Sequence, residues 1–202
     1  MTLVTCIMPT ADRRAFIPAA IRMFLAQDYP EKQLLIVDDG ACDVEDLVPV
    51  HPQIRYIRRK SHESLGSKRN VACDAADGDI ILHWDDDDWY APWRLRYQVG
   101  ALESGQFDVC GLNRVFFVDA SKELAFEYVY PASGRPWVCG ATLCYRKSLW
   151  EHHQFADARV GEDTRFIFSA RGARVGVLGD NRFFVARIHP ANTCLLYTSR
   201  CV

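Results

Sequence analysis

Aspartates cluster at two places in this 202-residue chain, each time directly after a short apolar run. Asp38-Asp39-Gly40 follows residues 34–37, and Asp85–Asp88 follow residues 80–84. Isolated charge runs are usually solvated loops, but the hydrophobic and aromatic flanks fix the second cluster to the end of a buried strand. Four neighbouring carboxylates repel one another, and a divalent cation would relieve that repulsion. Oxygen ligands of this kind favour Mg²⁺ or Mn²⁺, completed by substrate phosphates and water.

The first cluster has two interpretations, because Asp-Gly after a strand is also a common turn signature. Its significance comes from the basic residues that lie between the two clusters: Arg58, Arg59, Lys60, Lys68 and Arg69. Carboxylates can accept hydrogen bonds from base and ribose, while a metal and cationic side chains take phosphates. The combination predicts a site for a nucleoside diphosphate, although a single surface arginine is most often just solvated.

The elements that must position these residues alternate in type. Apolar periodicity predicts strands at 3–8, 33–37, 54–57 and 79–84, and helices at 16–25, 66–76 and 92–103, with a weak helix at 44–48. Such alternation predicts an α/β fold with a parallel, doubly wound sheet, in which ligands bind outside the carboxyl ends of the strands. After residue 105 the pattern predicts strands at 115–118, 126–130, 175–178 and 183–188 in a mixed sheet, with a helix at 164–170.

Composition limits the possible partners and location. With 24 basic and 26 acidic residues, the net charge of −2 gives no field that would recruit nucleic acid. No apolar run is long enough to span a membrane, and the amino terminus has no signal-peptide features. The eight cysteines are scattered without a CxxC pair, which predicts buried reduced thiols. We therefore expect a cytoplasmic protein, or one peripheral at the inner membrane face.

The last nine residues, 194–202, resemble the translation of a sequencing-library transposon end joined to its own reverse complement. An amphipathic final strand is the alternative. We expect an artefactual tail on a carboxy-terminally truncated chain, so we assign no function to this segment.

The chain resembles the family 2 glycosyltransferases over nearly all of residues 1–193. The segments that carry the resemblance are Thr5–Thr10, Gln27–Pro30, Leu35–Gly40, Lys68–Ala72, Gly78–Ile81, Asp85–Pro92 and Gly161–Asp163. Each is weak alone, but their order and spacing are specific. The resemblance implies a GT-A (Rossmann-like) nucleotide-diphospho-sugar transferase fold, with a central mostly parallel sheet flanked by helices and a smaller mixed sheet. We expect one domain over 1–193, with a nucleotide-binding half at 1–104 and an acceptor half at 105–193.

The resemblance also implies roles on the donor side. Asp39 corresponds to the family carboxylate that binds the nucleotide base. Asp85 and Asp87 match the Asp-x-Asp motif, in which the second aspartate holds the metal and the first lies near the ribose and metal. The remaining residues assigned to nucleotide or donor binding are Pro9, Thr10, Lys68, Arg69, Asp86 and Gly140.

On the acceptor side, Glu162-Asp163 matches the family's Glu-Asp pair at a helix start, where the aspartate is the catalytic base. The alternative for this pair is charge complementarity to the helix dipole. His189 resembles a late histidine that completes metal or diphosphate contacts, or is structural. Trp137 lies in the segment that faces the donor sugar and the acceptor in relatives, which predicts stacking on a sugar ring. The alternative is that Trp137 packs in the core. With Glu162, it is assigned to the acceptor.

Together these expectations describe an inverting, metal-dependent transfer of sugar from a nucleoside-diphosphate sugar, most simply a UDP-sugar, to an acceptor hydroxyl. The cofactor is Mn²⁺ or Mg²⁺, and the acceptor is a sugar, a lipid-linked group or a protein. Two alternatives stay open. Acidic clusters and basic loops also serve metal-dependent nucleotidyltransferases. A truncated chain could bind the donor without turnover.

Overall fold

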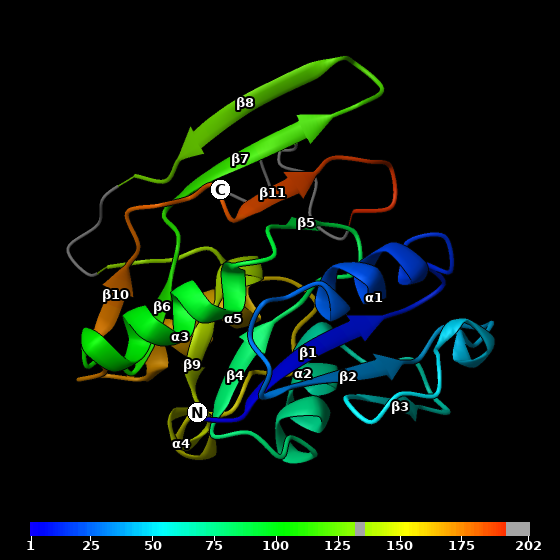
Figure 1. The fold of residues 1–202 in the computed structure, drawn as a ribbon, viewed down its shortest axis with the longest axis horizontal. Helices are drawn as coiled ribbons and strands as arrows, with labels where there is room; N and C mark the ends of the chain where they lie inside the picture. The colour runs from blue at the N-terminus through cyan, green and yellow to red at the C-terminus, as the bar shows by residue number, and fades with distance from the viewer. Residues whose placement is uncertain (132–135, 193–202) are drawn as a thin grey trace.

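The computed structural model describes residues 1–131 and 136–192, and its centre is a run of parallel strands (Figure 1). In spatial order these are β3 (Ile54–Arg58), β2 (Lys32–Asp38), β1 (Val4–Thr10) and β4 (Ile80–His83). Every residue of β1 and β4 is buried, as expected for parallel strands covered on both faces. The carboxyl ends of these strands therefore meet at one edge of the sheet.

Beyond β4 the sheet changes direction. Strand β9 (Cys144–Arg146) pairs antiparallel with both β4 and β6 (Val109–Gly111), and β10 (Val175–Val177) pairs parallel with β6 at the edge. The result is a seven-stranded mixed sheet in the order β10-β6-β9-β4-β1-β2-β3. The predicted parallel core is confirmed. Strand β9, between β4 and β6, is antiparallel to both of these neighbours.

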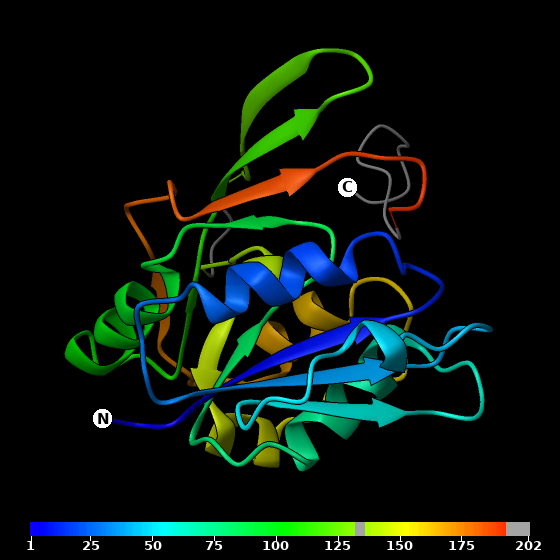
Figure 2. The same cartoon turned by 45° about the vertical axis from the view of Figure 1, so that its right-hand side comes forward.

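Helices cover both faces of this sheet. Alternate strand residues pack with α1 (Ile17–Leu25) and α3 (Arg94–Ser104) on one face. The other set packs with α2 (Leu65–Asp74), α4 (Lys147–His152) and α5 (Glu162–Ser169). Figure 2 shows the blue helix α1 above the sheet and the teal helix α2 below it. None of the helices in the described ranges is long and apolar enough to cross a bilayer.

A second, four-stranded sheet lies over the α1 face (Figures 1 and 2). Its order is β5 (Trp89–Tyr90), β11 (Phe184–Arg187), β7 (Arg114–Asp119) and β8 (Leu124–Val129). It is mixed, since β11 runs parallel to β7 while β5 and β8 are antiparallel to their neighbours. Strand β5 begins directly after the second aspartate cluster, so the two sheets meet at the predicted site.

Some local expectations were incomplete. The weak helix expected at 44–48 is a short 3₁₀ helix, η1 (Glu45–Leu47). Strands β5, β6 and β9 and helix α4 were not predicted, because they have two, three, three and six residues and are too short for a periodic signal.

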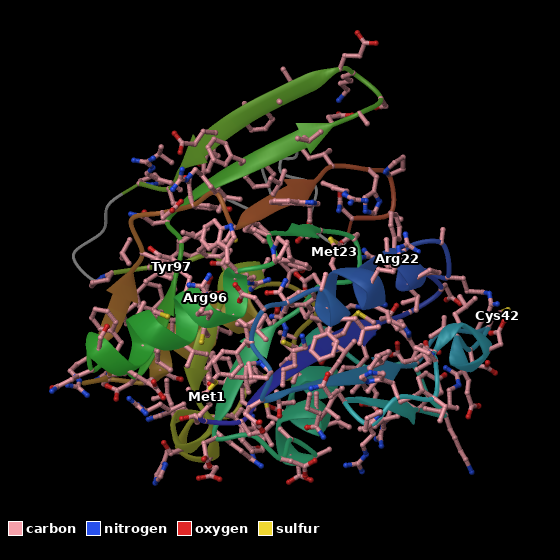
Figure 3. The ribbon with its side chains drawn as sticks, viewed as in Figure 1. Met1, Arg22, Met23, Cys42, Arg96 and Tyr97 are labelled. Carbon is pink, nitrogen blue, oxygen red and sulfur yellow. The ribbon has the colours of Figure 1, made fainter. Side chains whose placement is uncertain are left out.

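The six cysteines in the described ranges are all free. Those at 6, 73, 110 and 144 are buried, which agrees with the sequence expectation, but Cys42 is exposed beside η1 (Figure 3). The expected tail at 194–202 lies outside the described residues. The division of the chain at residue 104 stays a prediction.

Candidate active site

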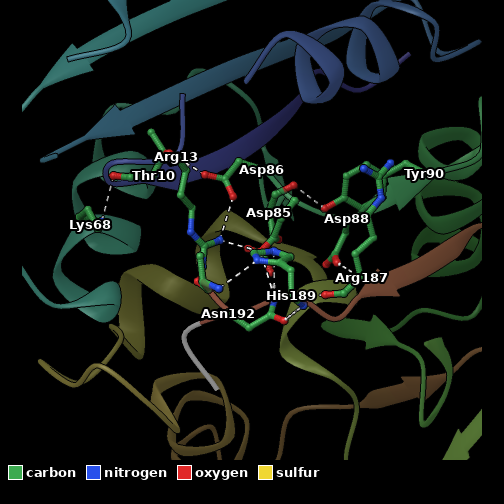
Figure 4. Close-up of polar contacts among 12 residues, drawn as sticks. Thr10, Arg13, Lys68, Asp85, Asp86, Asp88, Tyr90, Arg187, His189 and Asn192 are labelled. Carbon is green, nitrogen blue, oxygen red and sulfur yellow. Dashed lines mark hydrogen bonds and ion pairs between the residues drawn. The ribbon is translucent and has the colours of Figure 1, made fainter. Parts of the chain in front are cut away.

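The second aspartate cluster forms a turn between β4 and β5, fixed at both ends. The Trp84 amide donates to the Ile7 carbonyl at 2.9 Å, and the Tyr90 hydroxyl donates to the Asp85 carbonyl at 2.8 Å. At the far side, Asp88 accepts from the Arg187 amide at 3.0 Å, which joins the turn to β11 (Figure 4). The turn is therefore held by both sheets.

The four carboxylates of this turn have different surroundings. Asp86 accepts from the Thr10 hydroxyl at 2.6 Å, and burial raises the pKa of Asp86 to about 6 while the Arg13 guanidinium opposes that shift. Burial also raises the pKa of Asp85 and Asp88, and their neighbour Asp87 adds to both shifts. Crowded, partly desolvated carboxylates of this kind favour a bound cation.

Asp87 is the meeting point of three segments. Its Oδ2 atom accepts from Arg13 Nη1 at 2.6 Å and lies 3.0 Å from His189 Nε2 and 3.3 Å from Asn192 Nδ2. His189 and Asn192 follow β11, whereas Arg13 follows β1. The predicted proximity of His189 to the Asp-x-Asp motif is thus present in the structure.

The donor atoms here fit a divalent cation. Carboxylate oxygen and imidazole nitrogen are both ligands of Mn²⁺, and Asp87 and His189 present them side by side. Within 1–131 and 136–192, no three His, Cys, Asp or Glu side chains form a fuller ligand group. Substrate phosphates and water would have to complete the coordination, which is how Mg²⁺ and Mn²⁺ sites commonly work.

Asp39 lies at the end of β2 with its side chain fully covered. Its Oδ1 atom accepts from Lys68 Nζ at 2.6 Å, and its Oδ2 atom accepts from the Glu63 amide at 2.6 Å. The ring of His62 lies over the same oxygen, with Nδ1 at 3.2 Å. Lys68 also donates to the Thr10 carbonyl at 3.1 Å, so this lysine holds the loops after β1 and β2 together.

Its neighbour Asp38 has the structural role that the turn signature suggested. The Asp38 carboxylate accepts from the amides of Gly40 and Val44 at 2.9 and 3.1 Å and from the Tyr56 hydroxyl at 2.8 Å. Asp38 therefore fixes the turn. Asp39 is covered by Lys68, Glu63 and His62, and its role toward a nucleotide stays a prediction.

Arg69 joins two predicted site residues. Its guanidinium is buried, pairs closely with Glu162 and lies 3.6 Å from Asp85. Burial raises the pKa of Glu162, and Arg69 opposes this shift. These contacts of Arg69 link α2 to α5 and to the aspartate turn. In the structure, the Glu162 carboxylate is the ion-pair partner of Arg69.

Asp163 begins α5 beside the short 3₁₀ helix η2 (Gly140–Thr142). Its Oδ1 atom accepts from the Thr164 amide at 2.6 Å. A Cβ atom on Gly140 would lie 1.8 Å from Asp163 Oδ2, so only glycine leaves room for this carboxylate. His83 is buried, and its Nδ1 atom lies 2.7 Å from the Gly140 carbonyl oxygen, which joins the end of β4 to η2. Burial lowers the pKa of His83 well below its usual value.

Aromatic side chains border the cavity next to Asp163. Trp137 Nε1 donates to the Thr164 hydroxyl at 3.1 Å, and its ring lies 4.2 Å from that of Tyr130, centroid to centroid. Phe117 of β7 lines the same cavity. Trp137 is half-buried and faces the cavity, so it is not a core residue.

One cavity of about 730 Å³ collects nearly all of the predicted site residues. The predicted residues that line it are Pro9, Thr10, Lys68, Arg69, Asp85, Asp86, Asp87, Trp137, Gly140, Glu162 and Asp163. Asp39 and His189 adjoin it through Lys68 and Asp87. The basic residues at 58–60 do not line it; Arg58, for example, donates to the carbonyl of Asp38 at 3.2 Å.

Several lining residues were not singled out from the sequence, namely Arg13, His62, Glu63, Tyr130, Arg159 and Asn192. Arg13 had a usable signal, since it lies three residues after the predicted site residue Thr10. The others come from loops whose course a periodic pattern does not show.

A mixed sheet whose strand ends carry an acidic cavity, closed by a small second sheet, defines the GT-A class of nucleotide-sugar transferase folds. The chain belongs to glycosyl transferase family 2, whose family model matches residues 5–160.

Two curated relatives illustrate the similarity. An uncharacterised glycosyltransferase of Haemophilus influenzae is 23% identical over 163 residues, covering 74% of this chain and 64% of that protein. TarS of Staphylococcus aureus, a poly(ribitol-phosphate) beta-N-acetylglucosaminyltransferase, is 24% identical over 206 residues, covering 92% of this chain and 36% of TarS. The chain thus spans less than two thirds of the length of these relatives.

Solved structures support the same fold. TarS residues 1–349 with UDP-GlcNAc match with a TM-score of 0.75 at 19% identity, covering 95% of this chain and 60% of that one. The mannosyltransferase PcManGT of Pyrobaculum calidifontis, in complex with GDP-Man and Mn²⁺, matches with a TM-score of 0.71 at 19% identity, covering 93% and 56%.

Proposed function

We propose that this protein transfers a sugar from a nucleoside-diphosphate sugar to an acceptor hydroxyl with inversion at the anomeric carbon. The observation that carries the proposal is that carboxylates of two separate segments line one cavity: Asp85–Asp87 after β4 and Asp163 in the first turn of α5. Asp39, directly after β2, pairs with the lining residue Lys68. One donor and one acceptor bound in this cavity would contact the groups to which we assign donor binding, metal binding and proton transfer.

On the donor side, Asp39 and Pro9 would bind the base, and Asp85 and Asp86 would adjoin the ribose and diphosphate. A UDP-sugar is the donor we propose, because TarS, which has this fold, was solved with UDP-GlcNAc. PcManGT was solved with GDP-Man, so the guanine nucleotide is the alternative to be tested.

A divalent cation, Mn²⁺ or Mg²⁺, would be held by Asp87 with His189 and Asp85 adjoining, and would supply positive charge to the departing diphosphate. The bound Mn²⁺ in the PcManGT complex supports this assignment. The contacts of Asp85 and Asp88 with Tyr90 and Arg187 fix the turn that carries Asp87, which supports this assignment.

Asp163 would accept the proton of the acceptor hydroxyl as that hydroxyl attacks the anomeric carbon. The backbone amide of Thr164 fixes one carboxylate oxygen, and the absence of a side chain at Gly140 leaves room for the other, in a residue that lines the cavity. Trp137 and Tyr130 would border the acceptor, and their aromatic faces suit a sugar ring.

The first test replaces the two groups assigned to chemistry. We expect Asp163→Asn to reduce transfer by at least a hundredfold with UDP affinity nearly unchanged, because the amide keeps the shape but accepts no proton. We expect Asp87→Asn to weaken binding of Mn²⁺ and of UDP together. Radiolabelled sugar transfer and isothermal titration measure both, and near wild-type transfer by a folded variant would refute that residue's role.

The same assay separates the alternatives. A nucleotidyltransferase catalyses attack on a phosphorus atom, so with added pyrophosphate it would convert the nucleoside-diphosphate sugar into a nucleoside triphosphate and a sugar 1-phosphate. A glycosyltransferase releases the intact nucleoside diphosphate as the sugar moves to the acceptor. Binding of UDP with Mn²⁺ but no hydrolysis or transfer would identify a donor-binding module.

We propose a location in the cytoplasm, or at the inner membrane face, as expected from the sequence.

A further inference from the structure

Arg13 occupies the centre of the acidic cavity. Its Nη1 atom lies 2.9 Å from Asp86 Oδ1 and 2.6 Å from Asp87 Oδ2, and its Nη2 atom donates to the Ala191 carbonyl (Figure 4). The side chain is only 17% exposed. One guanidinium therefore joins the loop after β1, the aspartate turn and the segment after β11.

The backbone before Arg13 is fixed by a separate set of contacts. Asp12 has a left-handed conformation with φ of 56°, and its Oδ1 atom accepts from the Ala41 amide at 2.7 Å. Gly40 allows this approach, since a Cβ atom there would lie 2.5 Å from the Asp12 amide nitrogen. The placement of Arg13 is thus determined by the loop itself, and Arg14, the next residue, lies outside and pairs with Asp46.

The oxygen that Arg13 contacts is the same one that adjoins His189. Asp87 Oδ2 lies within hydrogen-bond distance of Arg13, His189 and Asn192. A cation that binds this oxygen must take the place of at least one of these donors, and the guanidinium is the one whose charge opposes it. When Arg13 leaves Asp87 it keeps Asp86 and Ala191, so it need not leave the site.

We propose that Arg13 competes with the divalent cation for Asp87 and so sets how tightly the protein binds the metal. This inference depends on the proposed function only for the assignment of Asp87 as the metal-holding residue. Arg13 acts here as a positioning residue: it holds Asp86 and Asp87 in register and weakens metal binding through the same contact.

The consequence is a gain of affinity when the arginine is removed, which loss of structure would not produce. A hydrogen bond between charged groups contributes enough that its loss changes a competing equilibrium by about tenfold or more. Arg13→Gln removes both the positive charge and the planar, forked set of N–H donors of the guanidinium. Arg13→Lys keeps the charge but replaces the planar fork with a single point charge that cannot reproduce all three contacts.

The test is titration of the protein with Mn²⁺ alone, with free Mn²⁺ followed by its electron paramagnetic resonance signal. We expect Arg13→Gln to bind Mn²⁺ at least ten times more tightly than the wild type and Arg13→Lys at least three times more tightly. The matched control Arg14→Gln should equal the wild type, and Asp87→Asn should lose binding. If Arg13→Gln does not fold, as judged by circular dichroism, Arg13→Lys carries the test.

Each other outcome overturns a definite statement. If neither Arg13 variant gains affinity while Asp87→Asn loses it, the competition is refuted and the metal site stands. If only Arg13→Gln gains, long-range charge explains the effect and contact competition is refuted. If Asp87→Asn binds Mn²⁺ like the wild type, the assignment of Asp87 is wrong and both proposals about the metal fall.

Discussion

Gly140 leaves room for the carboxylate of Asp163, the proposed catalytic base, because glycine has no side chain. The atoms of Asp163 lie where the Cβ of any other residue at 140 would be, so the carboxylate and the 3₁₀ helix η2 fit only because position 140 is a glycine. The family resemblance assigns Gly140 to donor binding, but it does not indicate that Gly140 contacts Asp163. The reason for it appears only when α5 is placed against that loop.

We expect Gly140→Ala to lower turnover by about a hundredfold, since misplacement of a catalytic group by about 1 Å can cost that much. Affinity for UDP should change far less, because Asp163 is assigned to the acceptor side. The control is Gly100→Ala on the exposed face of α3, where a Cβ atom meets nothing within 4 Å and should stabilise the helix by about 0.5–1 kcal/mol. Turnover of Gly140→Ala within threefold of the wild type would contradict the placement of Asp163.

Among the elements, α2 and α5 are joined by the buried pair of Arg69 and Glu162, whose side chains are 3% and 4% exposed. The same guanidinium lies 3.6 Å from Asp85. Relative motion of either helix would therefore disturb the aspartate turn as well as the start of α5.

We expect Glu162→Ala to lower the free energy of unfolding by about 3 kcal/mol, because it leaves a buried guanidinium with a weaker partner. The comparison is Arg96→Ala on the surface of α3, which removes an exposed pair with Asp28 and should cost at most about 1 kcal/mol (Figure 3). Guanidinium chloride denaturation measures both. Equal losses in the free energy of unfolding would show that the buried pair stabilises the fold no more than the exposed pair does.

The sequence predicts strands β1 to β4 and helices α1 to α3, because the buried strands are short apolar runs and the segments between them are long enough for helices, with the clearest helical period in α1. It does not predict β9, whose three residues give no period and whose direction is set only by the partners β4 and β6. Likewise, the motifs predict which aspartates and cations belong to the site, but they do not indicate that Arg69 pairs with Glu162. Contacts between distant segments decide such details.

For the molecule as a whole, both halves of the chain build the cavity. Its lining comes from the loops after β1, β3 and β4, from the start of α2, and from residues after 105, including Gly161–Thr164, Arg187, Ile188, Ala191 and Asn192. A ligand that fills it must therefore contact segments that are far apart in sequence.

We expect UDP with Mn²⁺ to slow amide hydrogen exchange in residues 9–13, 62–69, 84–88 and 187–192 together, and to raise the unfolding midpoint, because ligand binding favours the folded state. Helix α4 lies away from the lining and serves as the internal control. Protection confined to residues before 105 would show that the second half takes no part in donor binding.

The hairpin of β7 and β8 stands out from the rest of the molecule (Figure 2) and contributes Phe117 to the cavity, with Tyr130 directly after it. None of the carboxylates assigned to donor, metal or proton lies on it. If the acceptor lies against these aromatic rings as proposed, substitutions in this hairpin can change which acceptor is used in the course of evolution. The residues assigned to donor, metal and proton would stay the same.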